Sequence, residues 1–224
     1  MTLHLLPNLL GESASPDFNF IKALPEIVNN LDGFLVEHPK EARKYLKHFD
    51  FAKLRDKPME ILDKRTRDFN LLLEPIKRGE SWGVITDAGL PCIADPGSDL
   101  VSHAQKAKIN VMAYPGPSSI ILALMLSGLN SQQFVFQGYF PRQIDRTIRN
   151  ENRTQVFIET PYNNQKTLSK LLEVLDKKDI LCVACDLTLS TQEVITQSMS
   201  KWHSAMQQNN FHKRPAIFLL KITL

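Results

Sequence analysis

The sequence predicts an α/β protein that is built from two α/β domains. Strand-like and helix-like segments alternate along most of the 224 residues, which is typical of sheets covered by helices. The Pro115-Gly-Pro117 segment interrupts this alternation. It cannot continue a strand, because proline lacks the N–H that a ladder hydrogen bond needs. We therefore expect an N-terminal domain over residues 1–114 and a C-terminal domain over residues 115–224.

In the first half, short apolar runs bounded by Gly, Pro or polar residues predict strands. These runs are Leu3–Pro7, Gly33–Glu37, Met59–Leu62, Trp82–Thr86 and Ile109–Tyr114. The segments between them predict helices, at Pro25–Leu31, Pro39–Phe49, Asp68–Lys77 and Ser98–Lys106. Two of these helices open with a proline, which is tolerated in the first turn because that N–H has no helical partner.

The second half begins with a strongly apolar helix, Ser118–Leu126. Further strands are expected at Phe134–Tyr139, Gln155–Glu159, Ile180–Asp186, Glu193–Thr196 and Ala216–Ile222. Further helices are expected at Ile144–Asn152, Asn164–Leu175 and Met199–Gln207. This second alternation is what makes two α/β domains of similar length the simplest interpretation.

Composition excludes several classes of protein. Hydrophobic residues make up 43% and charged residues 23%, which is a globular balance and not that of a disordered chain. The longest apolar run, Ile120–Leu126, is far shorter than the ~20 residues that a membrane span needs, and no signal peptide is visible. Three cysteines cannot build a disulfide framework, so we expect a reducing cytoplasm.

Metal and redox sites are not expected either. Cys182 and Cys185 form a C-x-x-C pair, but they lie in a predicted strand, where residues three apart point to opposite faces. The six histidines are scattered along the chain, without the spacing of a metal site. A net charge of +3 permits an anionic partner without requiring one.

The Thr86–Gly97 segment is the strongest candidate for a binding loop. Seven of the nine glycines lie between Gly79 and Gly138, and this segment follows an apolar strand and precedes a helix. Ligands of parallel α/β sheets bind at that position, outside the carboxyl ends of the strands. Neither a dinucleotide fingerprint nor a phosphate-binding P-loop occurs. A second rigid turn, Pro115–Ser119, follows the next strand, so two loops can form two walls of one pocket.

Several motifs in this region occur in a fixed order. They are Asp87-Ala-Gly-Leu-Pro91, Asp95-Pro-Gly97, Pro115-Gly-Pro-Ser-Ser119, Ser127-Gly-Leu129 and Phe134-x-Phe136-x-Gly-Tyr-Phe-Pro141. In order and spacing they resemble the tetrapyrrole methylase superfamily. Within it they are most similar to the branch that holds the 16S ribosomal RNA 2'-O-ribose methyltransferases. The resemblance is strong from Trp82 to Pro141 and weaker, but collinear, beyond.

That resemblance implies a methyltransferase with S-adenosylmethionine bound in a cleft between two α/β domains, without a metal. It also implies a cytoplasmic homodimer that acts on ribosomal RNA. The cofactor contacts implied by the family's motifs fall at Pro7, Gly89, Leu90, Ile93, Ser118, Ser119, Ile120, Thr160, Leu187, Pro215 and Ala216. The chain departs from the family pattern at Glu37-His-Pro-Lys40 and at Cys185-Asp-Leu-Thr-Leu189, which has lost both basic residues of its motif. These departures affect the substrate more than the reaction type.

Four arginines are candidates for RNA contact. Arg142, Arg146, Arg149 and Arg153 are spaced four, three and four residues apart, which would place them on one face of the expected Ile144–Asn152 helix. Arginine suits phosphate because its planar fork donates two parallel hydrogen bonds. The alternative is an ordinary solvated helix face.

The catalytic base is left open by the sequence. A ribose hydroxyl is a poor nucleophile that gains from a general base, and the candidates are Glu159, Asp186 and Glu193; each can equally be structural. Two other functions also stay open. One is methylation of a small tetrapyrrole-like substrate, and the other is a cofactor-binding module without catalysis.

Overall fold

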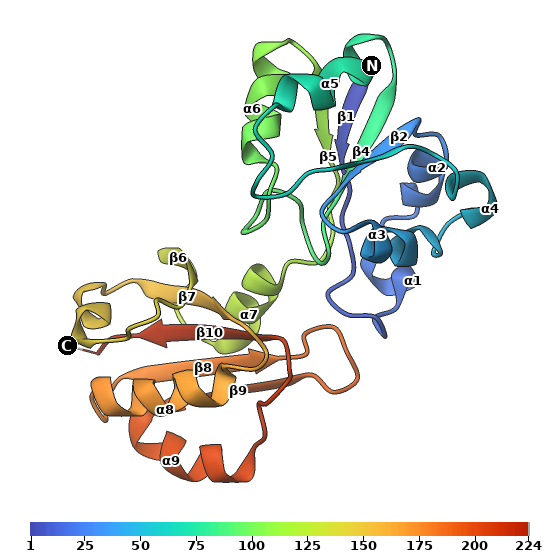
Figure 1. Ribbon diagram of the computed structural model, residues 1–224. Helices are drawn as coiled ribbons and strands as arrows, with labels where there is room; N and C mark the ends of the chain where they lie inside the picture. Colours follow the sequence, from blue (N-terminus) through green and yellow to red (C-terminus); the bar gives the residue numbers. More distant parts are fainter. Residues whose placement is uncertain (224) are drawn as a thin grey trace. The chain divides into compact units, whose positions relative to one another are not determined.

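The computed structural model describes residues 1–223, and the chain divides into two compact units, Met1–Ser118 and Ser119–Leu224 (Figure 1). Each unit holds one five-stranded sheet with helices, which confirms the predicted α/β class. The division falls inside the Pro115–Ser119 segment. The predicted domain limits, 1–114 and 115–224, stay a prediction. Leu224, the last residue of the predicted C-terminal domain, lies outside the described residues.

The N-terminal unit is a parallel sheet in the order β3-β2-β4-β1-β5. Its strands are β1 (Thr2–Leu5), β2 (Gly33–Val36), β3 (Met59–Ile61), β4 (Ser81–Ile85) and β5 (Asn110–Ala113). Its helices are α1 (Pro16–Asn19), α2 (Leu24–Asn29), α3 (Pro39–Leu46), α4 (Phe51–Leu54), α5 (Phe69–Lys77) and α6 (Ser98–Lys106). All five predicted strands and all four predicted helices are confirmed here.

Both faces of this sheet are buried, as the alternation of side chains along β2 shows. Leu35 packs into a core with residues of α5 and α6, whereas Phe34 and Val36 pack into a core with residues of α2 and α3. All four residues of β2 are buried. A parallel sheet covered on both faces needs such continuously apolar strands. Since every strand points the same way, the loops that follow the strands meet at one edge.

The C-terminal unit is a mixed sheet in the order β6-β7-β10-β8-β9. Only β6 and β7 pair in parallel, and the other pairs among the described strands are antiparallel. Its strands are β6 (Phe134–Tyr139), β7 (Thr154–Glu159), β8 (Ile180–Cys185), β9 (Glu193–Ser198) and β10 (Ala216–Lys221). Its helices are α7 (Ser119–Ser127), the 3₁₀ helix η1 (Arg146–Asn150), α8 (Asn164–Val174) and α9 (Met199–Gln208).

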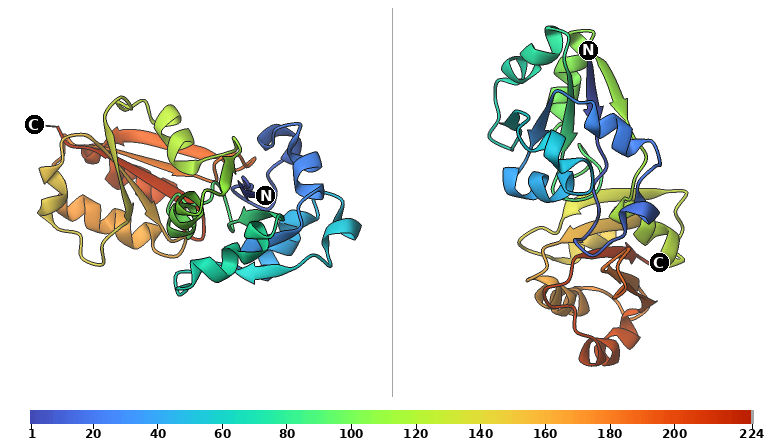
Figure 2. Two further views of the ribbon diagram at one scale, coloured as in Figure 1. Left: turned by 90° about the horizontal axis from the view of Figure 1, so that it is seen from above. Right: turned by 90° about the vertical axis from the view of Figure 1, so that its right-hand side faces the viewer.

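Helices cover both faces of the mixed sheet. Helices α8 and α9 lie on one face and α7 on the other (Figures 1 and 2). Cys185 belongs to the core that includes Trp202 of α9. Cys182 is buried too but does not belong to that core, as expected for residues three apart on a strand. Burial raises the pKa of Cys182 to about 11 and that of Cys185 to about 12, so both thiols stay protonated.

One predicted helix differs from the structure, and two short helices were not predicted. The Ile144–Asn152 α-helix is wrong, since η1 covers only Arg146–Asn150 and is a 3₁₀ helix. The Asp145 side chain accepts a hydrogen bond from the Thr147 N–H at 2.8 Å and so begins a tight turn instead. The short helices α1 and α4 were not expected, because four residues carry no helical periodicity. Within residues 1–223, no helix has the length and hydrophobicity to cross a bilayer.

Candidate functional site

The loops that follow β1 and β4 are tied together by Asn8. Its side-chain amide donates to the carbonyl oxygens of Thr86 at 2.8 Å and Asp87 at 3.1 Å. Its backbone N–H donates to the Gly89 carbonyl at 2.7 Å. Asn8 is only 7% exposed, so these bonds are shielded from water. The start of the Thr86–Gly97 loop is therefore held in one conformation by the loop next to it.

The turn that follows β5 packs against the same two loops through Gly116. A Cβ added to Gly116 would lie 2.1 Å from Pro7 Cβ and 3.5 Å from Leu90 Cδ2, so no other residue fits without displacing backbone. Gly89 has φ +71°, and its Cβ would lie 3.3 Å from Leu10 Cδ2. The structure thus brings three of the predicted cofactor residues, Pro7, Gly89 and Leu90, to one edge, beside the turn that carries Ser118.

The rest of the Thr86–Gly97 loop turns sharply and presents an apolar residue to solvent. Cys92 and Ala94 have positive φ angles of 68° and 66°, which are uncommon for residues with a Cβ. Ile93, between them, is 47% exposed. Of the predicted cofactor residues in this unit, Ile93 has the most exposed side chain, while Leu90 and Ser118 are partly buried. Burial raises the pKa of the Cys92 thiol to about 11, so it is not a nucleophile at neutral pH.

Carboxylates gather at this same edge. Burial, with Glu37 and Asp87 nearby, raises the pKa of Asp95 to about 6. Burial, with Asp87 nearby, also raises the pKa of Glu37. Repulsion between like charges contributes to both shifts, because the three carboxylates lie close together.

His38 lies among these carboxylates. Its Nδ1 is 2.7 Å from Asp87 Oδ2, and this hydrogen bond raises the pKa of His38. Among the described residues, Glu37, His38 and Asp87 are the group whose potential metal-ligand atoms all lie within 4.8 Å of one another. The expectation that the protein holds no metal stays a prediction.

A polar pocket lies beside these loops. It has a volume of about 300 Å³ and is walled by the segment 8–12, by residues of α3 and by Asp87 and Ala88. Tyr45 contributes to its lining, and the Tyr45 hydroxyl is buried with no hydrogen-bond partner among the residues that the structure describes. The pocket therefore adjoins the Asp87–Leu90 segment on the α3 side.

In the C-terminal unit, the predicted cofactor residues Ser119 and Ile120 lie in the first turn of α7, and the other four lie at one edge of the mixed sheet. Ala216, at the start of β10, pairs with Glu159 on one side and with Cys185 on the other. Cys185 in turn pairs with Glu193. Antiparallel pairing thus places strand starts beside strand ends. The structure brings together Thr160, Leu187, Pro215 and Ala216, with the candidate bases Glu159, Asp186 and Glu193.

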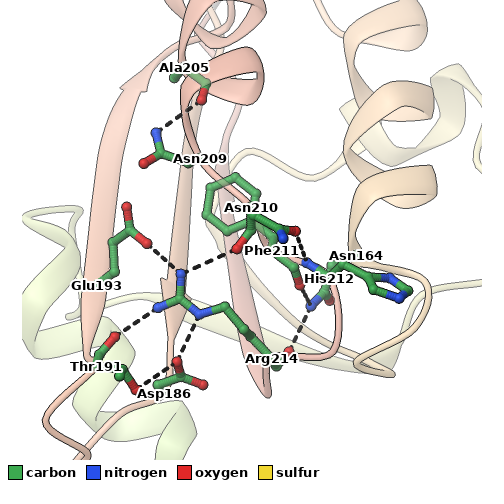
Figure 3. Close-up of polar contacts among 10 residues, drawn as sticks. All are labelled: Asn164, Asp186, Thr191, Glu193, Ala205, Asn209, Asn210, Phe211, His212 and Arg214. Carbon is green, nitrogen blue, oxygen red and sulfur yellow. Dashed lines mark hydrogen bonds and ion pairs between the residues drawn. The ribbon is translucent and has the colours of Figure 1, made fainter.

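Arg214 neutralises two of those carboxylates (Figure 3). Its Nε donates to Asp186 Oδ2 at 2.7 Å, and its Nη1 donates to Glu193 Oε2 at 2.5 Å. Its Nη2 donates to the Thr191 carbonyl at 2.8 Å, and Thr191 Oγ1 donates to Asp186 Oδ2 at 2.9 Å. One oxygen of each carboxylate, Asp186 Oδ2 and Glu193 Oε2, is therefore held by Arg214. Arg214 was not among the sequence-predicted site residues, because it lies 28 residues beyond Asp186 in the sequence and only the folded sheet brings the two together.

Glu159 is also held by neighbours. It accepts hydrogen bonds from the Thr160 N–H at 2.6 Å and from the Thr167 hydroxyl at 2.5 Å. These bonds fix the start of the segment between β7 and α8. The structure gives each of the three candidate bases a structural partner, so their catalytic role stays a prediction without added support.

The four arginines do not share one helical face, and that prediction is wrong. Arg142 and Arg153 lie outside η1, and Arg153 folds back onto Glu151 at 2.5 Å. Arg149 is paired with Asp176 at 2.6 Å and with the fully buried Asp179 at 3.1 Å. Arg146 contacts Asp176 at 3.1 Å with a side chain that is 71% exposed. The ion pairs of Arg146 and Arg149 join residues distant in the sequence and fix the local conformation.

Comparison with known proteins identifies the class. The family profile of tetrapyrrole (corrin/porphyrin) methylases matches residues 26–201. The chain is 31% identical over 216 residues to the ribosomal RNA small subunit methyltransferase I of Streptococcus pyogenes serotype M3, covering 93% of this chain and 72% of the relative. It is 29% identical over 210 residues to the protein of that name from Halalkalibacterium halodurans, covering 89% and 69%. The crystal structure of uroporphyrin-III-C-methyltransferase from Thermus thermophilus has the same fold, with a TM-score of 0.60, 14% identity and coverage of 98% and 94%.

The fold and these similarities define a methyltransferase. The chain belongs to the tetrapyrrole methylase family, and its methyl donor is S-adenosylmethionine. The resemblance, the enzyme class and the cofactor predicted from the motifs are thereby confirmed. The cleft between the domains and the individual contact residues stay predictions.

The residues of the N-terminal edge fit this donor. S-adenosylmethionine carries a positive sulfonium and a positive ammonium group, and the edge gathers the carboxylates of Glu37, Asp87 and Asp95. Gly89 and Gly116 allow Leu10 and Pro7 to pack closely against the main chain, and Leu90 and Ile93 offer apolar surface for an adenine ring. These features are compatible with a cationic donor at this edge, and the contact residues stay a prediction.

Proposed function

We propose that the chain methylates a ribose 2'-hydroxyl of small-subunit ribosomal RNA, in the cytoplasm and as a homodimer. The observation that carries the proposal is the 31% identity over 93% of the chain to a relative named ribosomal RNA small subunit methyltransferase I. The loops described above would hold the donor, and the acceptor would be one nucleotide of a large RNA. The net charge of +3 is compatible with such a partner.

The reaction depends on alignment. The acceptor oxygen, the methyl carbon and the sulfur must lie in line, and holding that geometry supplies much of the catalysis. In the N-terminal unit, Pro7, Gly89, Leu90, Ile93 and Ser118 would bind the donor. In the C-terminal unit, the donor would be bound by Ser119, Ile120, Thr160, Leu187, Pro215 and Ala216. The rigidity of the Asn8-linked loops supports this role, because a site that is already ordered loses less entropy on binding.

RNA would be held mainly by phosphate contacts, which position the substrate without reading its sequence. Arg142, Arg146 and Arg153 are exposed and suit this role. Arg149 does not, because its guanidinium is shared between Asp176 and Asp179 and its side chain is only 20% exposed. The proposed phosphate contacts are therefore limited to the three outer arginines.

The direct test is to delete the gene and compare the nucleotides of small-subunit ribosomal RNA by mass spectrometry. We expect one 2'-O-methyl group to disappear and to return when the gene is restored. The purified protein should add the same group in vitro to RNA from the deletion strain. An unchanged methylation map would exclude this substrate.

The similarity in fold to uroporphyrin-III-C-methyltransferase leaves a small tetrapyrrole-like substrate as the second candidate. Methyl transfer to a porphyrin precursor, with none to RNA, would favour that candidate. Binding of S-adenosylmethionine without transfer to either substrate would favour a module that binds the cofactor but does not catalyse.

A further inference from the structure

His38 and Asp87 are brought together by strands that are not consecutive in the sequence. Strands β2 and β4 are parallel neighbours, and Val36 pairs with Ile85 at their carboxyl ends. His38 and Asp87 each lie two residues beyond this pair. Parallel register therefore places them side by side, and His38 Nδ1 lies 2.7 Å from Asp87 Oδ2.

Asp87 occupies a fixed position within the Thr86–Gly97 loop. Its carbonyl oxygen accepts a hydrogen bond from the Asn8 amide at 3.1 Å, and Gly89 follows two residues later. The side chains of His38 and Asp87 are 63% and 41% exposed. The backbone of Asp87 is thus held in place, and both side chains are accessible to a substrate as large as RNA.

The hydrogen bond also determines which nitrogen of His38 is free. An ionised carboxylate can only accept a hydrogen bond, so the hydrogen between the two groups belongs to Nδ1. In the neutral imidazole, Nε2 then carries a lone pair and can accept a proton. A histidine oriented by a carboxylate in this way is the usual form of a general base.

We propose that His38 accepts the proton of the acceptor hydroxyl and that Asp87 is the positioning residue that orients it. This inference rests on the proposed function. The hydroxyl oxygen forms a bond to the methyl carbon, and the carbon–sulfur bond breaks with its electron pair remaining on sulfur. The hydroxyl proton moves to Nε2 of His38, which becomes an imidazolium paired with Asp87. The sulfonium thereby becomes a neutral thioether, and charge is conserved.

The surroundings of His38 favour its protonated form. The groups that act on it are Asp87 from the loop after β4, Glu37 from the end of β2 and Glu41 from α3, all of which are acidic. Lys64 and Asp63 act on the neighbouring Glu37, and Asp95 lies in the same cluster. The acids stabilise the imidazolium that forms as the methyl group transfers. They also raise the pKa of His38, so the base is active only above that raised pKa.

The test is a comparison of pH profiles for methyl transfer to ribosomal RNA from a deletion strain. The variants are His38→Gln and Asp87→Asn, and the control is His103→Gln, which removes a histidine of α6. We expect His38→Gln to lower kcat about 100-fold, within the range of general-base effects, with KM and the affinity for S-adenosylmethionine unchanged. Asp87→Asn should move the acidic limb of the profile to lower pH, because His38 loses the carboxylate that raises its pKa.

Each result separates the possible explanations. No transfer to RNA by the parent protein would overturn the proposed function itself, and this inference with it. If the parent protein methylates RNA, two results would overturn only the inference. One is a kcat of His38→Gln within threefold of the parent's, and the other is an acidic limb of the pH profile that Asp87→Asn does not move. Loss of activity in EDTA, restored by a divalent cation, would instead assign Glu37, His38 and Asp87 to a metal. If His38→Gln failed to fold, Asp87→Asn would still give the shift of the limb.

Discussion

The edges of the two sheets hold their predicted site residues by different means. In the parallel N-terminal sheet, loops after neighbouring strands interlock through the Asn8 hydrogen bonds and the contact of Gly116 with Pro7. In the mixed C-terminal sheet, strand starts and ends bring carboxylates together, and Arg214 neutralises them. The first edge is therefore fixed by backbone geometry and the second by charge. A change of shape should damage the first edge, and a change of charge the second.

The largest effect on stability is expected at the edge of the C-terminal sheet, where Arg214 neutralises two carboxylates. Arg214→Met leaves Asp186 and Glu193 without their counterion, and Asp186 is only 8% exposed. Breaking such a pair should lower the free energy of unfolding by about 3 kcal/mol. Arg153→Met is the matched control, because its partner Glu151 is also in this unit but the arginine is 47% exposed, so its loss should cost much less.

Urea unfolding of protein labelled with 5-fluorotryptophan would measure the free energy of unfolding of each unit separately. Trp82 lies in the N-terminal unit and Trp202 in the C-terminal unit, so each unit gives its own fluorine NMR signal. Adding Glu193→Gln to Arg214→Met should recover part of the loss by removing one unpaired charge. Equal costs for Arg214→Met and Arg153→Met would contradict a charge-held edge.

At the edge of the N-terminal sheet, the substitution with the largest expected effect on packing is Gly116→Ala. The new methyl group would overlap Pro7 Cβ, and overpacking of this kind costs about 2 kcal/mol. We expect the Trp82 signal to report the destabilisation and the Trp202 signal to stay unchanged. High salt should not alter the cost, because no charge is involved. A loss confined to the Trp202 signal would show that the turn is not held by Pro7.

A smaller effect of opposite sign is expected at Asp95. Its folded-state pKa of about 6 lies above the ordinary value of 3.8, so ionisation destabilises the folded state as the pH rises through this interval. Asp95→Asn removes the penalty. Since Asp95 is only half-buried, the gain at pH 8 should be about 1 kcal/mol and should vanish at pH 4. Thermal unfolding at the two pH values would check this, and equal gains at both would refute it.

The smallest effect is expected from Arg142→Glu, on the surface of the C-terminal unit. Phosphate contacts add up over several arginines, so one reversal should weaken RNA binding only severalfold at low salt, while stability changes by less than ~0.5 kcal/mol. Filter binding with ribosomal RNA measures the affinity. Lys178→Glu, in the same unit, is a control for the loss of net charge. Equal weakening by both variants would mean that Arg142 makes no specific contact.

The sequence predicted those parts of the molecule that depend on neighbouring residues. Strands such as Gly33–Val36 are short apolar runs, and the Thr86–Gly97 loop is marked by its own glycines and prolines. Both are local signals that do not require knowledge of the sheet order. The predicted roles of Pro7, Gly89 and Leu90 came instead from the resemblance to the family's motifs.

Other parts depend on contacts between distant residues and could not be predicted. The pairing of His38 with Asp87 requires β2 to lie beside β4, although β3 separates them in the sequence. The partners of Arg214 are fixed by the antiparallel placement of β10 beside β8. The arginine pattern suggested an α-helix, but Asp176 and Asp179, which lie after α8, bind Arg149 in another conformation.

The most direct test of the account is a calorimetric titration of S-adenosylmethionine into three proteins. Gly89 and Gly128 have nearly equal φ angles of 71° and 69°, but a Cβ at Gly89 would contact Leu10, whereas one at Gly128 would meet nothing within 4 Å. Backbone strain in the two alanine variants is therefore matched. We predict that the parent and Gly128→Ala bind alike and that Gly89→Ala binds at least tenfold more weakly. Undiminished binding by Gly89→Ala, or no binding by the folded parent, would contradict the assignment of this edge to the methyl donor.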